Sequence, residues 1–148
     1  MILDAFLEMS DAQAVTATAI STNVIDLGPV TDNVLRDVGT GEDVYWVLSV
    51  GTTFTGLTSL QASLVSDSTV NLATSPTTHV ATAVIPVASL VAGYTYAVKL
   101  PAGSYEQYLG TSYTVVGAGV LGKIDSFLTK DAQLYRAYAD RSPIDGNA

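Results

Sequence analysis

Turn-forming residues interrupt the chain at short intervals, and this spacing constrains the fold more than any other feature of the sequence. The segments between the turns are rich in Thr, Val, Ile and Tyr, which favour strands. The candidate strands are residues 15–20, 24–27, 43–50, 59–66, 79–86, 94–100, 107–116 and 122–130. About eight short antiparallel strands with turn signals between them, such as Gly51 and residues 117–119, predict an all-β sandwich or barrel.

The first candidate strand lies in SDAQAVTATAISTNVIDLG, residues 10–28. From Val15 small apolar residues alternate with threonines, at the period of two that a half-buried strand requires. The alternation breaks at residues 21–23, which predicts a tight turn or a bulge. Helix is expected only as single turns at residues 32–36 and 86–91.

Length and composition predict one domain over residues 1–148, with apolar surface left for contacts with other molecules. Hydrophobic residues make up 48% of the 148 residues and charged residues only 14%. A membrane span is not expected, because the longest apolar run, residues 85–92, is interrupted by Pro86 and Ser89. Asp4 and Glu8 lie where a signal peptide carries no charge, and the absence of cysteine suits a reducing cytoplasm.

The net charge of −8 is unevenly distributed along the chain. Residues 1–98 hold nine acidic residues and one basic residue, whereas residues 99–148 hold five of each. Nucleic-acid binding is not expected, since phosphate contacts require a basic surface. An acidic body with a locally basic tail favours a protein partner.

The two ends of the chain are the candidate contact segments, an N-terminal arm at residues 1–12 and a C-terminal arm at residues 131–148. The N-terminal arm packs either on its own sheet or on a neighbouring subunit. The C-terminal arm is a short helix, an extended arm that reaches another subunit, or a solvated terminus. The candidate contacts with a protein partner or another subunit are apolar, Tyr and Arg residues of the types enriched at interfaces: Phe6, Leu7, Leu134, Tyr135, Arg136, Tyr138 and Arg141.

Catalytic chemistry has little support in the sequence. His79 is the single histidine, and no orienting partner or nucleophile can be named for it, so a structural or surface role is favoured over a general base. No nucleophile elbow, phosphate loop or zinc-binding helix motif occurs. We therefore expect no enzyme activity, no catalytic residue and no cofactor.

Two hypotheses of ligand binding stay open although no enzyme activity is expected. Residues 37–43 offer oxygen ligands on a glycine-rich loop, but their spacing fits no known calcium loop, so a solvated turn is favoured and no metal is expected. Tyr94 and Tyr96 share one face of a candidate strand, which raises the alternative of a carbohydrate-binding jelly roll. Half-buried strand tyrosines are the commoner case, and Trp46 is expected in the core.

A resemblance adds to these inferences. The stretch SDAQAVTATAISTNVIDLG resembles the start of the capsid cement, or decoration, proteins of Bordetella-phage-type short-tailed bacteriophages. The similarity continues more loosely through residues 37–42, 75–77 and 108–114 and through Gly122-Lys123. It departs at residues 29–36, where this chain has a longer link.

The resemblance implies a jelly-roll sandwich that binds the outer surface of a phage head. Its partner would be the major capsid protein, and it would stabilise the contacts between capsomers. It implies a virion protein that is made in the host cytoplasm and has no catalytic residues. Self-association is expected, with a dimer favoured over a trimer. The rivals are the carbohydrate-binding module, a hydrolase and a tail or connector component.

Overall fold

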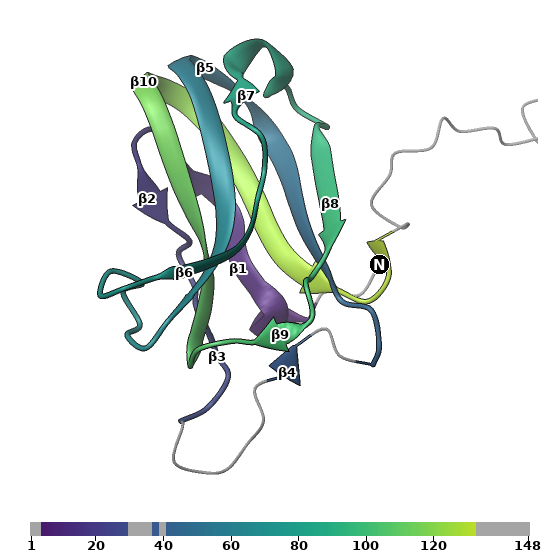
Figure 1. Ribbon diagram of the computed structural model, residues 1–148. Helices are drawn as coiled ribbons and strands as arrows, with labels where there is room; N and C mark the ends of the chain where they lie inside the picture. The colour runs from purple at the N-terminus through teal and green to yellow at the C-terminus, as the bar shows by residue number, and fades with distance from the viewer. Residues whose placement is uncertain (1–3, 30–36, 39–40, 133–148) are drawn as a thin grey trace, which may run out of the picture.

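Two long antiparallel strands, β5 (Tyr45–Asp67) and β10 (Tyr108–Thr129), run through the whole fold. The computed structural model describes residues 4–29, 37–38 and 41–132. Within it, β5 and β10 pair from Tyr108 opposite Asp67 to Thr129 opposite Tyr45 (Figure 1). The pair forms a long ribbon that bends back on itself at the upper end of the view in Figure 1.

The shorter strands flank this ribbon on both sides. Three strands pair with β10: β1 (Glu8–Ala14), β2 (Ala19–Ile20) and β3 (Ile25–Asp26). Three others pair with β5: β6 (Thr77–Ala81), β7 (Ile85–Pro86) and β8 (Thr95–Lys99). A separate two-stranded sheet joins β4 (Asp37–Val38) to β9 (Gly103–Ser104), and the 3-10 turns are η1 (Ala5–Leu7) and η3 (Val87–Ser89).

Because the ribbon bends, its two halves belong to two layers that face each other. One layer has the order β1-β10-β5-β8, built on residues 45–50 of β5. The other has β2 and β3, then β10 and β5, then β6 and β7, built on residues 59–67. The predicted all-β class is confirmed, and this order of strands is compatible with the predicted jelly roll.

The bend lies where the sequence predicted turns, but the strands continue through it. Gly51 and residues 117–119 lie inside β5 and β10 rather than between strands. Gly56 and Gly117 have φ angles of 86° and 94°, which L side chains rarely adopt. The register of the pair shifts between Val116 and Ile124. The ribbon therefore changes direction through bulges, and neither strand ends at the bend.

The predicted strand at residues 15–20 is wrong in its bounds. Strand pairing begins at Glu8 in β1, residues 16–18 bend, and pairing resumes in β2. The alternating stretch connects the two layers. It is hydrogen-bonded to the bend of β10, since Val15 N donates to Gly122 O at 3.3 Å and Gly119 N donates to Thr16 O at 3.1 Å. The predicted break at residues 21–23 and the single turn at residues 86–91 agree with the structure.

The core between the layers is apolar but contains a hydrogen-bonded polar cluster. Trp46 is fully buried, as predicted, and its Nε1 donates to Ser126 Oγ at 3.0 Å and Thr111 Oγ1 at 3.2 Å. The Ser10 and Tyr113 hydroxyls bond at 2.8 Å across the layers. The cluster satisfies its buried polar groups within the protein, as a stable core requires.

Candidate interaction surfaces

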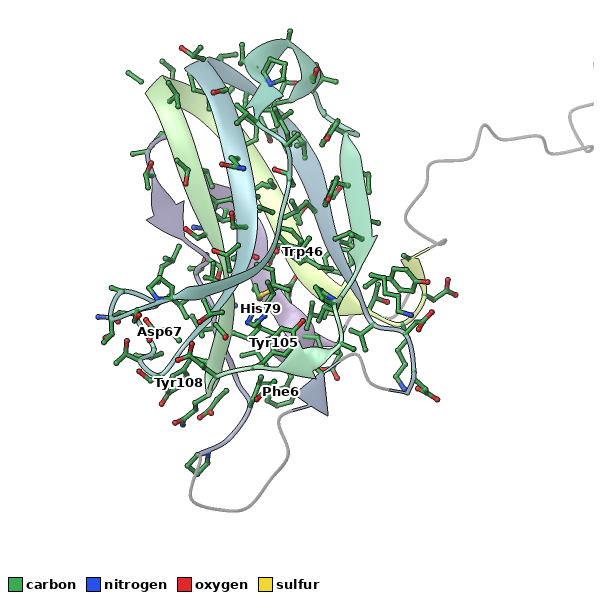
Figure 2. The ribbon with its side chains drawn as sticks, in the orientation of Figure 1. Phe6, Trp46, Asp67, His79, Tyr105 and Tyr108 are labelled. Atoms are coloured by element: carbon green, nitrogen blue, oxygen red, sulfur yellow. The ribbon has the colours of Figure 1, made fainter. Side chains whose placement is uncertain are left out.

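His79 lies in a packed polar cluster at the end of the sandwich opposite the bend (Figure 2). Its Nε2 is 2.8 Å from Ser66 Oγ, and its ring stacks on Tyr105 with centroids 3.8 Å apart. Burial lowers the pKa of His79, and the charge of Glu106 opposes that effect in part. Ser66 is fully buried and accepts a hydrogen bond from Glu106 N at 3.1 Å, so its hydroxyl holds the cluster together and faces no solvent.

Asp67, which the sequence analysis did not single out, organises the loop at residues 68–76. Its buried carboxylate accepts backbone hydrogen bonds from Thr74 at 2.8 Å, Thr69 at 3.3 Å and Ser75 at 3.4 Å. Burial raises the pKa of Asp67, but the bonds from Thr74, Ser75, Thr69 and Ser68 together hold it below its usual value. An aspartate followed by Ser-Thr at a strand end is an Asx-turn signal that could have identified it.

Two acidic residues of the glycine-rich loop, Glu42 and Asp43, form ion pairs. Asp43 pairs with Lys99 at 2.5 Å, and Glu42 pairs with Lys130. The hydrogen bond and charge of Asp43 raise the pKa of Lys99. No group of three or more His, Asp and Glu side chains that could hold a metal is found within residues 4–29, 37–38 and 41–132.

The tyrosines offer little exposed ring surface. Of the six at described positions, Tyr105 and Tyr113 are buried. The other four, Tyr45, Tyr94, Tyr96 and Tyr108, are half-buried. Burial raises the pKa of Tyr113 to about 12, against the opposing hydrogen bond from Ser10. A sugar-stacking platform would need rings that stand free of the sheet.

Exposed apolar side chains gather instead where the ribbon bends. We call this surface the bend end; it comprises residues 51–58 of β5, 84–93 and 114–122 of β10 (upper end of Figure 1). Residues 90–93 lie beside β5, since Phe54 N donates to Leu90 O at 2.9 Å and Ala92 N to Thr53 Oγ1 at 3.0 Å. The exposed large apolar residues of the bend end are Val84, Val91, Val116, Val120 and Leu121.

The predicted contact residues differ in position and exposure. Phe6 of η1 is 86% exposed and lies at the other end of the sandwich (Figure 2). Leu7 is half-buried and packs against the core. The remaining five lie outside the described residues: Leu134, Tyr135, Arg136, Tyr138 and Arg141. The exposed valines of the bend end were missed, because nothing in the sequence says that the two halves of the ribbon form one bend.

Comparison with protein families gives a match to Bbp16 over residues 9–128. The chain belongs to the Bbp16 family. Bbp16 is a family of Bordetella phage proteins, so this chain is a phage virion protein, and the predicted resemblance is confirmed at that level. The match runs from β1 almost to the end of β10 and therefore includes both layers. No curated protein matches this Bbp16-family chain. Among the described residues, no helix has the length and apolar character to cross a membrane.

Proposed function

We propose that this Bbp16-family protein is a capsid cement, or decoration, protein. It binds the outer surface of the phage head, where its partner is the major capsid protein, and it stabilises contacts between capsomers. It associates with itself, with a dimer favoured over a trimer, and it carries out no catalysis and uses no cofactor.

The observation that carries the proposal is the family match over the whole sandwich. The described surface supports it, because large apolar side chains are exposed there while Glu42 and Asp43 of the loop are held in ion pairs. Contiguous exposed apolar groups are typical of protein interaction surfaces. Many modest contacts of this kind, repeated over a shell, add up through multivalent attachment.

The carbohydrate-binding alternative has weaker support. Its platform would be exposed tyrosines, and the six described tyrosines are buried or half-buried. A sugar-binding assay therefore serves as a control for the proposal rather than as a second proposal.

Cosedimentation tests the proposed function directly. Purified protein is mixed with expanded empty heads of the source phage, and with unexpanded heads in parallel. We expect saturable pelleting at a fixed ratio to the major capsid protein. An absence of pelleting with both kinds of head would overturn the cement role, and copy number in purified virions would distinguish it from a connector component.

A further inference from the structure

The stretch that connects β8 to β10, residues 100–107, is fastened to the large sheet by two consecutive residues. We call it the connecting segment; it carries β9, which forms a separate sheet with β4. Tyr105 is 3% exposed and stacks on the ring of His79 in β6, with the centroids 3.8 Å apart (Figure 2). Glu106 N donates to Ser66 Oγ in β5 at 3.1 Å. The polar cluster around His79 therefore holds the connecting segment against β5 and β6.

The Ser66 hydroxyl fixes which nitrogen of His79 carries the proton. Ser66 is fully buried, and its Oγ already accepts the hydrogen bond from Glu106 N. Its own hydrogen needs an acceptor inside the protein, and among the described residues that acceptor is His79 Nε2, at 2.8 Å. Ser66 thus donates to His79. It follows that Nε2 carries no proton and that the neutral ring has its proton on Nδ1.

A second proton on His79 is incompatible with this arrangement. An imidazolium ring donates from both nitrogens, so Nε2 would change from acceptor to donor. Ser66 Oγ would then face two N–H donors, and its own hydrogen would have no acceptor in a site closed to solvent. A buried donor without a partner is costly, so either the hydroxyl or the ring has to move. Movement of the hydroxyl breaks its bond to Glu106 N, and movement of the ring breaks the stack on Tyr105.

Few ionisable groups surround the His79 ring. From the connecting segment, the charge of Glu106 favours the protonated ring, and so does the face of Tyr105, whose own hydroxyl stays neutral because burial raises its pKa. In β5 the nearest ionisable residue is Asp67, whose carboxylate is directed into the hydrogen bonds of its own loop. Strand β6 holds no other ionisable side chain. Burial outweighs the charge of Glu106, because the pKa of His79 is lowered.

We propose that Ser66, His79 and Tyr105 form a latch that is closed while His79 is neutral and opens when Nε2 takes up a proton from solvent. This device goes beyond the proposed function and does not depend on it. Opening releases Tyr105 from the core and frees β9. Strand β4 moves with β9, because the two form a sheet of their own. The end of the sandwich opposite the bend therefore has two forms, and acid favours the open one.

The opening is local. The ladder between β5 and β10 holds both layers together without using residues 100–107. The connecting segment is braced internally, since Tyr105 Oη donates to Pro101 O at 2.7 Å. Its far end stays attached to the chain before β4, because Leu27 N donates to Gln107 O at 2.7 Å. Acid should thus expose the segment while both layers stay intact.

The first test determines the tautomer of His79. The chain contains a single histidine, so untagged protein labelled with 15N gives one pair of ring-nitrogen signals. Their chemical shifts at about pH 7.5 show which nitrogen carries the proton. We expect the proton on Nδ1. A proton on Nε2 would overturn the latch, because Ser66 could then not donate to the ring.

The second test measures amide hydrogen exchange at about pH 7.5 and about pH 5, with each rate divided by the intrinsic rate at that pH. The charge of Asp67 persists over this range, because its pKa lies below 3.8. At the lower pH the amide of Glu106 should lose about tenfold of its protection, since the open form binds a proton more tightly than the closed form. The amides of Leu48 and Leu64, one in each layer, should keep theirs. Equal protection of the Glu106 amide at both pH values would show that no latch opens.

Two variants assign the pH dependence to the latch. His79→Gln offers an amide oxygen in place of Nε2 and does not titrate, so the Glu106 amide should be equally protected at both pH values. Ser66→Ala removes the donor to Nε2, so the titration of His79 should shift to higher pH. Ser63→Ala is the matched control, because it makes the same change in β5 outside the cluster. It should leave both the exchange and the titration as in the wild type.

The variants also state how the proposal fails. If His79→Gln keeps the pH dependence of the wild type, another group opens the segment and the latch is wrong. If Ser66→Ala leaves the titration of His79 unchanged, the hydroxyl does not donate to the ring and the latch is wrong. Either variant decides the question if the other does not fold. None of these measurements uses phage heads, so the latch and the cement role stand or fail separately.

Discussion

Val120 lies directly over Gly56, with its Cγ2 only 2.7 Å from the place that a Cβ on Gly56 would occupy. The contact joins β10 to β5 at the point where the ribbon turns from one layer into the other. Gly56 also has a φ of 86°, so both the space and the backbone conformation require glycine there.

Replacement of Gly56 by alanine should therefore destabilise the fold. We expect Gly56→Ala to lower the free energy of unfolding by about 1–3 kcal/mol, because a methyl group meets backbone on β10 in a conformation that alanine adopts poorly. Gly51→Ala is the control, since its Cβ would lie 3.6 Å from Asp125 Oδ2, an ordinary contact. Urea unfolding of both variants checks this, and an equal loss in the two would contradict it.

The positions of the bend glycines within continuous strands also show how far the sequence could predict the fold. Strand-forming composition and frequent turn signals were enough for the all-β class. Residues 59–66 were correctly placed in a strand, and the predicted strand at residues 43–50 begins two residues later, at Tyr45. Gly51 was misread as the end of a strand because a glycine in a sequence looks the same in a turn and in a bend. Whether Gly51 lies in a turn or in a bend depends on the glycines of β10 that face this part of β5, and those are far away in sequence.

Trp46 should contribute stability through its indole nitrogen as well as its burial. Trp46→Phe removes the donor to Ser126 and Thr111, and we expect a loss of about 1–3 kcal/mol in the free energy of unfolding. Tyr96→Phe keeps the ring that meets Trp46 edge-on at 6.1 Å and should cost no more than about 0.5 kcal/mol. Denaturant titrations of the pair measure the difference, and similar costs would argue against the hydrogen bonds.

Asp67 should make the fold sensitive to acid. The folded-state pKa of Asp67 lies below its ordinary value of 3.8, so its carboxylate stabilises the folded state above that pH. The contribution is lost as pH falls through the folded-state pKa. Asp67→Asn should therefore lower the Tm at pH 7, and the gap to the wild type should close as the pH falls below about 4. Thermal melts across this range test it; a gap that stays constant with pH would exclude the carboxylate as its source.

His79 should remain neutral to a lower pH than a free histidine. Burial lowers its pKa from 6.5, so the unfolded chain takes up a proton first, and stability falls from about pH 6.5 down to the folded-state pKa. As the single histidine it gives one unambiguous NMR titration curve. Glu106→Gln removes a charge that raises the pKa of His79 and should shift the curve further down, whereas an upward shift would contradict this account.

The C-terminal arm gives a prediction about binding to the head. Deletion of residues 135–148 should weaken pelleting with heads if Tyr135, Arg136, Tyr138 and Arg141 contact the shell or a neighbouring subunit. Circular dichroism should stay unchanged, since β10 ends at Thr129. Unchanged occupancy on the heads would leave the arm without a role in binding.

The candidate site was harder to predict than the fold, for reasons that particular residues make clear. Phe6 was identified because a large apolar residue near a terminus is notable by itself. Val84, Val91 and Val120 each lie in segments that read as ordinary strands or turns, and they form one surface only after folding. The absence of charge from residues 44–66 and 68–98 was visible, but its meaning depends on where the bend places those segments.

The continuity of β5 and β10 has a mechanical consequence. Each strand passes through the bend from one layer into the other, so peptide bonds connect the layers twice within the strands themselves. A force that pulls the layers apart is therefore carried along the covalent backbone of both strands at the bend. A sandwich whose layers were joined only by loops would transmit the same tension through its least ordered segments.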